Sequence, residues 1–266
     1  MIHRTAIVDP AARLGEAVEI GPYALIGPEV EIGARTVVQS HAVIEGAVRL
    51  GAENLIGHAA IIGGTPQDLG FKSGTKSSVE IGDRNTIREH VTIHRGTADG
   101  SATRVGHHNF FMAGVHLGHN CAIGDKVVIA NNCLLGGYVE IGDGAFLGGN
   151  CVFHQFMRVG SLAITQGSGG FGKDIPPFVA AAGVNKVVGL NIVGLRRADF
   201  SADQRAEIKA AFRLLYESGL NVSQALAQAK RQSWSAPAKS FFDFVASAQR
   251  RGICALRRRA EKNTAG

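Results

Sequence analysis

An aliphatic side chain recurs at every sixth position over the first part of the chain. The series comprises Ile2, Val8, Leu14, Ile20, Ile26, Ile32, Val38, Ile44, Leu50, Ile56 and Ile62. Neither an α-helix nor an ordinary strand has a period of six residues. Glycine often follows the aliphatic residue, which indicates a turn after each short apolar segment. The pattern therefore predicts a chain that bends at regular intervals.

The spacing breaks near residues 64–78 and again near 96–104, and then continues from Val105 to Val159. A short internal repeat of this kind is typical of a solenoid, in which each unit buries its apolar side against the next. We predict a mainly β fold over residues 1–190, a hexapeptide β-helix with loop excursions at the two interruptions. Three hexads should form one triangular coil, so that residues about eighteen apart stack at roughly 4.8 Å.

Helical signals replace the hexads after about residue 190. Ser201 and Gln204 form a capping-box pattern before "IKAAFRLLYESG", which should end at Gly219. Two further helices are predicted in "VSQALAQAKRQ" and in "PAKSFFDFVASAQRRG". We therefore expect a small α-helical domain over residues 191–266.

Charge divides near the same boundary. The whole chain carries a formal net charge of +6, but the segment from Arg196 onward carries +8 and the preceding residues carry −2. Arg257, Arg258 and Arg259 are consecutive. Such a basic surface attracts an acidic protein, a phosphorylated substrate, an anionic membrane or nucleic acid. No aromatic stacking platform accompanies the charge, so nucleic acid is not expected as a partner.

Neither a signal peptide nor a stretch of about eighteen apolar residues is recognisable, so we expect a cytoplasmic protein with at most peripheral membrane contact. The four cysteines have no C-x-x-C spacing, and in the cytoplasm they should remain thiols with a packing role. They are Cys121, Cys133, Cys151 and Cys254.

The segment "VHLGHNCAIG" contains two histidines three residues apart. His116 and His119 flank Leu117, which is an inward residue of the repeat, so both should lie on the outer wall. Gly137 follows His119 by eighteen residues, and His154 stands two coils later above further glycines. A histidine bordered by glycines on the next coils has open space before it, which suits a ligand better than a packed neighbour.

Zinc is an alternative for these histidines, because related β-helix proteins bind zinc at subunit interfaces through histidines that include an i, i+5 pair. Here the spacing is three, and neither a third histidine nor the cysteines supply ligand spacing. We therefore predict no metal. A purely surface role is the remaining alternative.

Several irregular segments carry a resemblance to a known family. They are "PQDL" at 66–69, "IGDRNTIREHVTIHRGT" at 81–97, "HLGHNC" at 116–121, "FHQF" at 153–156, "DIPPFV" at 174–179 and "GLNIVGLRR" at 189–197. The chain resembles the acyl-carrier-protein–UDP-N-acetylglucosamine O-acyltransferases of lipid A biosynthesis over almost its whole length. The resemblance implies a left-handed β-helix and a homotrimer with active sites between neighbouring chains.

The resemblance also implies roles for individual residues. His119 matches the general base that deprotonates the sugar 3-hydroxyl, and Gly137 matches the backbone N–H that stabilises the oxyanion. Substrate-binding positions match Gln67, Asp68, His116, Asn120, Tyr138, His154, Gln155, Asn191 and Arg197. Gly167 matches the position that limits acyl-chain length, and His94 is a peripheral candidate. The implied substrates are a 3-hydroxyacyl chain on acyl carrier protein and a UDP-sugar, with no cofactor.

Some positions depart from the family pattern. Gly70 replaces a lysine, Tyr138 a histidine, Val193 a glutamate and Ala198 an arginine, while Asn120 replaces the carboxylate after the general base. These changes leave open whether the acceptor is UDP-N-acetylglucosamine or its 3-amino analogue. A paralogous N-acyltransferase would have an additional domain before the β-helix, whereas here the hexads begin at Ile2. A zinc-dependent carbonic anhydrase-like protein is the alternative from a different class.

Overall fold

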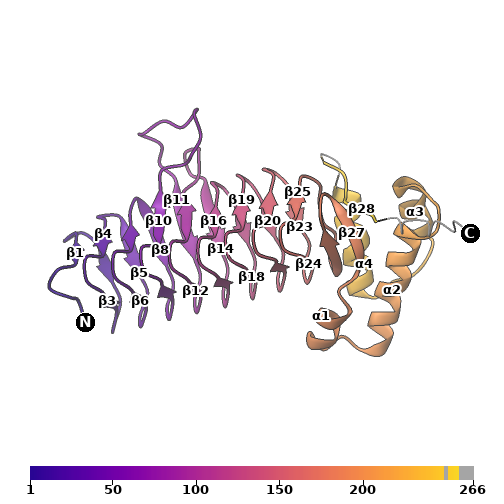
Figure 1. Ribbon diagram of the computed structural model, residues 1–266, viewed down its shortest axis with the longest axis horizontal. Helices are drawn as coiled ribbons and strands as arrows, with labels where there is room; N and C mark the ends of the chain where they lie inside the picture. Colours follow the sequence, from indigo (N-terminus) through magenta and orange to yellow (C-terminus); the bar gives the residue numbers. More distant parts are fainter. Residues whose placement is uncertain (249–250, 258–266) are drawn as a thin grey trace, which may run out of the picture.

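The computed structural model describes residues 1–248 and 251–257. Arg258 and Arg259, on which part of the predicted basic surface depends, lie outside these residues. The chain forms a left-handed parallel β-helix that is followed by four helices at one end (Figure 1). Each face of the triangular coil is one parallel sheet, so the predicted fold class is confirmed. No helix in the described ranges is long and apolar enough to cross a membrane.

Short strands repeat in three sheets. Sheet B contains β1 (Ile7–Val8), β4 (Leu25–Ile26), β7 (Val43–Ile44), β10 (Ile61–Gly64), β13 (Thr92–His94), β16 (His116–Leu117), β19 (Leu134–Leu135), β22 (Val152–Phe153) and β25 (Gly170–Phe171). Sheet C contains β2 (Arg13–Leu14), β5 (Val30–Ile32), β8 (Ala47–Leu50), β11 (Ser78–Ile81), β14 (Ala102–Val105), β17 (Ala122–Ile123), β20 (Glu140–Ile141) and β23 (Arg158–Val159).

The third sheet continues beyond the β-helix. Sheet A contains β3 (Glu19–Ile20), β6 (Val37–Val38), β9 (Leu55–Ile56), β12 (Thr86–Ile87), β15 (Phe110–Phe111), β18 (Val128–Ile129), β21 (Phe146–Leu147), β24 (Ile164–Thr165), β26 (Val179–Ala182), β27 (Lys186–Leu190) and β28 (Ala255–Leu256). Strand β27 is antiparallel to β26, and β28 then pairs with β27. The final strand therefore returns the end of the chain to the β-helix.

Inward aliphatic side chains fill the coil, one from each sheet, and those from Ile20 onward are almost completely buried. Cys133 and Cys151 are buried on adjoining coils, as their spacing predicts, and both are free thiols. The register between stacked coils is eighteen residues, as in the pairing of Leu117 with Leu135. It lengthens to 31 where β11 pairs with β8 and to 24 where β14 pairs with β11. These longer steps are the two excursions, residues 65–77 and 95–101.

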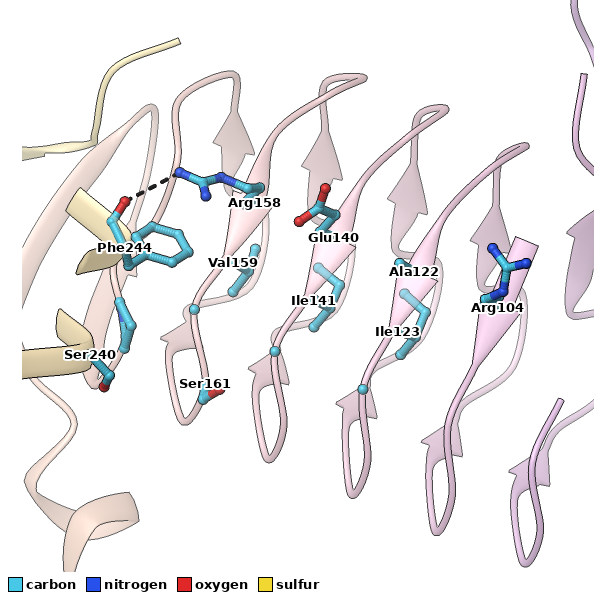
Figure 2. A pocket seen from close by; sticks show the side chains of 14 residues that line it. Arg104, Ala122, Ile123, Glu140, Ile141, Arg158, Val159, Ser161, Ser240 and Phe244 are labelled. Atoms are coloured by element: carbon cyan, nitrogen blue, oxygen red, sulfur yellow. Dashed lines mark hydrogen bonds between the residues drawn. The ribbon is translucent and has the colours of Figure 1, made fainter. Parts of the chain in front are cut away.

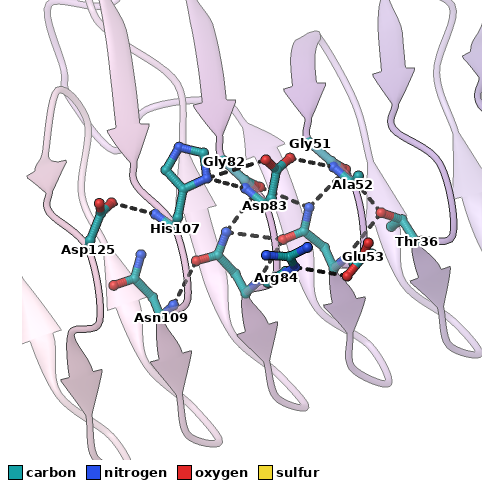
Figure 3. Close-up of polar contacts among 12 residues, drawn as sticks. Thr36, Gly51, Ala52, Glu53, Gly82, Asp83, Arg84, His107, Asn109 and Asp125 are labelled. Atoms are coloured by element: carbon teal, nitrogen blue, oxygen red, sulfur yellow. Dashed lines mark hydrogen bonds and ion pairs between the residues drawn. The ribbon is translucent and has the colours of Figure 1, made fainter.

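A ladder of buried polar side chains lines the corner between sheets C and A (Figure 3). It runs through Thr36, Asn54, Asn85 and Asn109, all at most 2% exposed. Asn54 Nδ2 donates to Gly51 O and Gly82 O, each at 2.9 Å, while its Oδ1 accepts from the Asn85 backbone N–H at 2.8 Å. A buried amide is stable here because these backbone and side-chain groups satisfy it.

Four helices follow the coil: α1 (Ile192–Arg197), α2 (Ala202–Tyr216), α3 (Val222–Ala229) and α4 (Ala236–Ser247). The capping box of Ser201 and Gln204 is present, and Asn221 with Gln224 forms a second one. Helix α2 ends at Tyr216, before Gly219. Helix α1 was missed because it is only six residues long; its N-cap is Asn191.

Arg158 connects the helices to the last coil. Its guanidinium pairs with Asp174 Oδ2 at 2.8 Å and donates to Ser247 Oγ at 2.9 Å, and it lies over the Phe244 ring at 4.4 Å. Asp174 is 3% exposed. This buried ion pair therefore fixes α4 against the end of the β-helix.

The outer faces of the three sheets differ in character. The outward column of sheet C alternates in charge through Arg13, Glu31, Arg49, Glu80 and Arg104. The outward column of sheet B is mostly apolar and comprises Ile7, Leu25, Val43, Ile61, Thr92, His116, Leu134 and Val152. That of sheet A is apolar at Val37, Leu55, Phe110, Val128, Phe146 and Ile164 and polar at Glu19 and Thr86. Sheet C thus presents the most highly charged surface of the three.

Candidate active site

A cavity of about 470 Å³ lies on the outer face of sheet B, next to its corner with sheet C. Its lining comprises Gln67, His94, His116, Gly118, His119, Leu134, Leu135, Gly136, Gly137, Val152, Phe153, His154 and Gln155. It therefore brings together six of the twelve predicted site residues, Gln67, His116, His119, Gly137, His154 and Gln155, together with His94. The lining comes from four consecutive coils and from the first excursion.

His119 stands at the corner that follows β16, with its side chain 13% exposed. Its Nδ1 lies 3.0 Å from Asn120 Oδ1, and its Nε2 lies 3.9 Å from Asp68 Oδ2. The imidazole thus has a neutral amide at one nitrogen and a carboxylate near the other. The separation from Asp68 is too long for a direct hydrogen bond.

Gly137 lies directly against the His119 ring on the next coil, as the eighteen-residue spacing predicts. A Cβ at Gly137 would stand 2.3 Å from His119 Cε1 and 2.4 Å from Nε2, closer than real contacts allow. Glycine is therefore required for the observed position of the ring. The neighbouring Gly136 N–H donates to Phe153 O, but the Gly137 N–H has no acceptor among the described residues. A backbone donor is consequently available beside the imidazole.

Two more histidines line the cavity behind His119. His116 Nδ1 is 2.7 Å from Thr92 Oγ1, and its ring meets that of His94 edge to face at 4.8 Å. Burial, and next the charge of His119, hold the pKa of His116 below its ordinary value. Burial, followed by the nearby cationic groups, lowers the pKa of His94 to about 4. Both side chains are accordingly neutral near pH 7.

His94, which the sequence indicated only as a peripheral candidate, lines the cavity itself. It is 8% exposed, and its Nδ1 is buried without a hydrogen-bond partner within the described residues. It is placed there because β13 ends at His94, just before the second excursion. The sequence signal was the motif "TIHRGT", but the excursion hid its register with respect to His116.

Aromatic residues cover the corner beside His119. Tyr138 meets the His119 ring edge to face at 5.3 Å and stacks on Phe156 at 4.7 Å. The Tyr138 hydroxyl is 3.2 Å from Thr97 Oγ1. Thr97 belongs to the second excursion and also contacts Asn120. It is the last residue of the segment at 81–97, but no role is predicted for it from the sequence.

The structure does not place every predicted residue at this cavity. Asn191 Oδ1 caps α1 by accepting from the Gly194 N–H, and its Nδ2 donates to Leu162 O at 2.8 Å. Arg197 ends the same helix, and Gly167 lies at the corner between sheets A and B. None of the three lines the cavity within one chain, so their roles stay predictions.

A second hollow of about 500 Å³ lies between the outer face of sheet C and α4. Figure 2 shows Arg104, Glu140 and Arg158 along this face, with Phe244 beside Arg158. Arg158 is engaged by Asp174, and Arg104 pairs with Glu80 at 3.0 Å. These contacts explain the hollow as part of the charged outer face and its junction with α4.

No cluster of three or more histidine, cysteine, aspartate or glutamate side chains that could hold a metal ion occurs within residues 1–248 and 251–257. The zinc alternative places its histidines between chains, and metal analysis of the purified protein tests it.

Comparisons with known proteins identify the family of the chain. A family model described as UDP N-acetylglucosamine O-acyltransferase, domain 2, matches residues 174–254, and one described as bacterial transferase hexapeptide (six repeats) matches residues 11–46 and 102–137. A relative from Paraburkholderia phymatum, an acyl-[acyl-carrier-protein]–UDP-N-acetylglucosamine O-acyltransferase, is 49% identical over 257 residues and covers 94% of this chain and 97% of its own length.

Two solved structures are similar over nearly the full chain. One is LpxA, a UDP-N-acetylglucosamine acyltransferase from Bacteroides fragilis, with a TM-score of 0.91 and 41% identity over 95% of this chain and 99% of that one. The other is LpxA from Acinetobacter baumannii, with a TM-score of 0.90 and 39% identity over the same shares.

Proposed function

The chain belongs to the family of acyl-[acyl-carrier-protein]–UDP-N-acetylglucosamine O-acyltransferases and is an acyltransferase of this kind, and from this premise we propose its chemistry. It transfers a 3-hydroxyacyl chain from acyl carrier protein to the glucosamine 3-position of UDP-N-acetylglucosamine in lipid A biosynthesis, with His119 as general base. The observation that supports this most is the contact of the His119 ring with Gly137 at the edge of the cavity.

In the proposed reaction, His119 Nε2 accepts the proton of the sugar 3-hydroxyl as that oxygen attacks the thioester carbonyl carbon. The new C–O bond gives a tetrahedral intermediate with a negative oxygen. The unused Gly137 N–H is a suitable donor for it, because a fixed backbone dipole stabilises charge that develops during the reaction. The C–S bond then breaks, and the departing thiolate takes the proton back from His119.

The polar residues around His119 are assigned to the UDP-sugar. Gln67 and Asp68 approach from the first excursion, and His116, His154 and Gln155 approach from the coils. Asn120 and Tyr138 shape the wall beside the base. Asn191 and Arg197 are assigned to the nucleotide across a subunit boundary, since they do not line the cavity of their own chain.

Leu134 and Val152 are assigned to the acyl chain. They are 47% and 49% exposed on the outer face of sheet B, and they lead from His119 toward the corner that contains Gly167. A bulky side chain at Gly167 would shorten this path. Gly167→Met should shift the donor preference to shorter 3-hydroxyacyl chains, measured by kcat/KM over a series of donors, and an unchanged profile would exclude this position as the limit.

The apolar outer faces of sheets A and B support a homotrimer. Parallel sheets are normally covered on both faces, and exposed apolar columns of this length indicate an interface. Contact between sheet A of one chain and sheet B of the next is heterologous, and such a contact closes into a ring of three when it rotates each chain by a third of a turn. Sedimentation equilibrium should give three chains per particle, whereas a monomer would contradict this assembly.

The basic tail is assigned to acyl carrier protein, and the reaction to the cytoplasm. Reversing Arg257, Arg258 and Arg259 to Glu should raise the KM for acyl carrier protein and weaken its salt dependence, because rim charges act mainly on encounter. The affinity for the UDP-sugar should stay unchanged. An unchanged KM for the carrier would move its docking site elsewhere.

A second acceptor, the 3-amino analogue of the UDP-sugar, is favoured by one observation. His119 Nε2 and Asp68 Oδ2 are two acceptors only 3.9 Å apart. A 3-amino group has two N–H donors and can satisfy both, while a 3-hydroxyl has one. Asn120 also supplies no negative charge to the imidazole, and an amine depends less on a strong base.

The kcat/KM values for the two UDP-sugars with one 3-hydroxyacyl donor test both candidates. Preference for the 3-hydroxy sugar excludes the amine as main acceptor, and the reverse preference establishes it. Absence of transfer to either sugar would contradict the proposed function.

A further inference from the structure

We propose that Thr97 is a positioning residue for His119, which it orients through Asn120 so that the Nε2 lone pair faces the cavity. The proposal rests on the proposed function only in taking His119 as the base. The hydrogen bonds that carry it stand independently of the reaction.

The first step concerns the identity of the Asn120 atom at His119. The Thr97 backbone N–H, which can only donate, lies 3.1 Å from Asn120 Oδ1. The atom that receives it must therefore be the amide oxygen and not the nitrogen. The Thr97 hydroxyl donates to the same oxygen at 3.0 Å, which reinforces this orientation.

The second step concerns the proton on His119. The same Asn120 oxygen lies 3.0 Å from His119 Nδ1, and an amide oxygen can only accept. His119 Nδ1 must then carry a hydrogen. In the neutral ring the lone pair is left on Nε2, the nitrogen that faces Asp68 and the cavity. Thr97 thus decides which nitrogen can accept the substrate proton.

The third step concerns how Thr97 itself is held. The Asp99 side chain accepts from the Lys76 N–H at 2.7 Å, and the Gly100 N–H donates to Lys76 O at 2.8 Å. Ser101 Oγ closes the short turn by accepting from the Ala98 N–H and donating to Ala98 O. The second excursion is therefore tied to the first, which carries Asp68.

The two excursions together enclose the imidazole. Thr97 acts on the Nδ1 side through Asn120, and Asp68 stands on the Nε2 side. Tyr138, whose hydroxyl meets Thr97 Oγ1, packs against the edge of the ring. Rotation of the ring about χ2 would break the Asn120 bond and move Nε2 from its place beside Asp68.

The test compares Thr97→Val with Thr97→Ser, using Ser101→Ala as the matched control. Valine preserves the shape and the backbone N–H but removes the hydroxyl that donates to Asn120. We expect kcat to fall about five- to tenfold, as for loss of one neutral hydrogen bond, with both KM values within about twofold. Serine should restore kcat. Ser101→Ala removes a side chain of the same excursion that does not touch Asn120, while the Asp99 and Gly100 contacts with Lys76 still hold Thr97, so kcat should change by less than about twofold.

The direct readout is ¹⁵N NMR of histidine-labelled protein, with the His119 signals assigned from a His119→Gln spectrum. The wild-type ring should carry its hydrogen on Nδ1, and Thr97→Val should raise the population of the other tautomer. A wild-type ring protonated on Nε2 alone would overturn the proposal, as would a Thr97→Val variant with unchanged kcat and unchanged His119 signals.

An effect of Ser101→Ala as large as that of Thr97→Val would also overturn it, because the loop in general would then be responsible. Failure of the proposed function looks different: His119→Ala would retain turnover, while the tautomer measured in the wild type would still decide the role of Thr97.

Discussion

Two corners of the same β-helix each contain a histidine beside an aspartate, but the two pairs have different roles. At the corner between sheets C and A, the Asp83 backbone N–H donates to His107 Nδ1 at 2.9 Å, and Asp83 Oδ2 is 3.5 Å from that nitrogen (Figure 3). At the corner between sheets B and C, His119 is 3.9 Å from Asp68. By distance alone, the first pair is the better His–Asp couple.

The difference lies in which nitrogen has its lone pair engaged. The His107 Nδ1 lone pair accepts a backbone N–H, so the hydrogen of the neutral ring is on Nε2 and no lone pair is left. His119 has the opposite arrangement and is also less exposed, at 13% against 48% for the His107 side chain. A hydrogen-bonding capacity that remains unused inside a cavity is therefore more informative than proximity to a carboxylate.

Exchanging each histidine for alanine is the sharpest way to break this comparison. His119→Ala should lower kcat by roughly 10²–10⁴-fold, as expected for loss of a general base, while the protein stays folded. His107→Ala should leave kcat within about twofold. Equal losses in the two variants, measured at saturating substrates and matched circular dichroism, would show that the corners are functionally alike.

A substitution in the buried ladder should have the opposite effect, a loss of stability without a loss of kcat. Asn54→Ala removes four hydrogen bonds and leaves the Asn85 N–H buried without its acceptor, while Gly51 O and Gly82 O keep their second donors, Thr36 Oγ1 and Asn85 Nδ2. We expect a loss of roughly 3 kcal/mol in the free energy of unfolding, measured in urea. The kcat of the remaining folded enzyme should match the wild type, and a large fall in kcat would contradict a purely structural role.

Gly137→Ala should displace the His119 ring without changing the fold. The three atoms nearest the added Cβ all belong to the His119 ring, so the ring must shift. We expect kcat to fall about 100-fold with little change in melting temperature. Gly172→Ala is the control, because its Cβ would meet His154 Cβ at an ordinary 3.8 Å. Similar kinetics of the two variants would count against the role of Gly137.

Acid should weaken the active-site corner before the polar ladder, which has no titrating group. Burial, followed by nearby cationic groups, lowers the pKa of His94 from 6.5 to about 4. Between those values the unfolded chain binds a proton that the folded chain does not, so stability falls as pH falls from about 6.5 to 4. We expect roughly 2 kcal/mol from this group. His94→Gln should flatten the unfolding free energy over that window, and an unaltered slope would assign the effect to other groups.

The sequence predicted the parts of the molecule that follow the repeat better than the parts that depend on the two excursions. The six-residue spacing was sufficient for the coil and for the contact of His119 with Gly137, since both lie in uninterrupted eighteen-residue register. The spacing could not place Asp68 or Thr97, nor show that His94 is buried. The excursions place these residues by local hydrogen bonds that no repeat encodes. The capping box of Ser201 and Gln204 predicted α2, and the segment "VSQALAQAKRQ" predicted α3, whereas α1 was too short to give a periodic signal.

The lengthened registers at the two excursions also bear on the conformational entropy of the unfolded chain. Loop-closure entropy grows only with the logarithm of loop length, so extending the step between stacked coils from 18 residues to 31 costs roughly 0.5 kcal/mol, and to 24 roughly 0.3 kcal/mol. Both insertions together therefore weaken the coil by less than about 1 kcal/mol. A repeat scaffold can thus acquire, lengthen or exchange the segments that carry its chemistry while its folding equilibrium hardly changes.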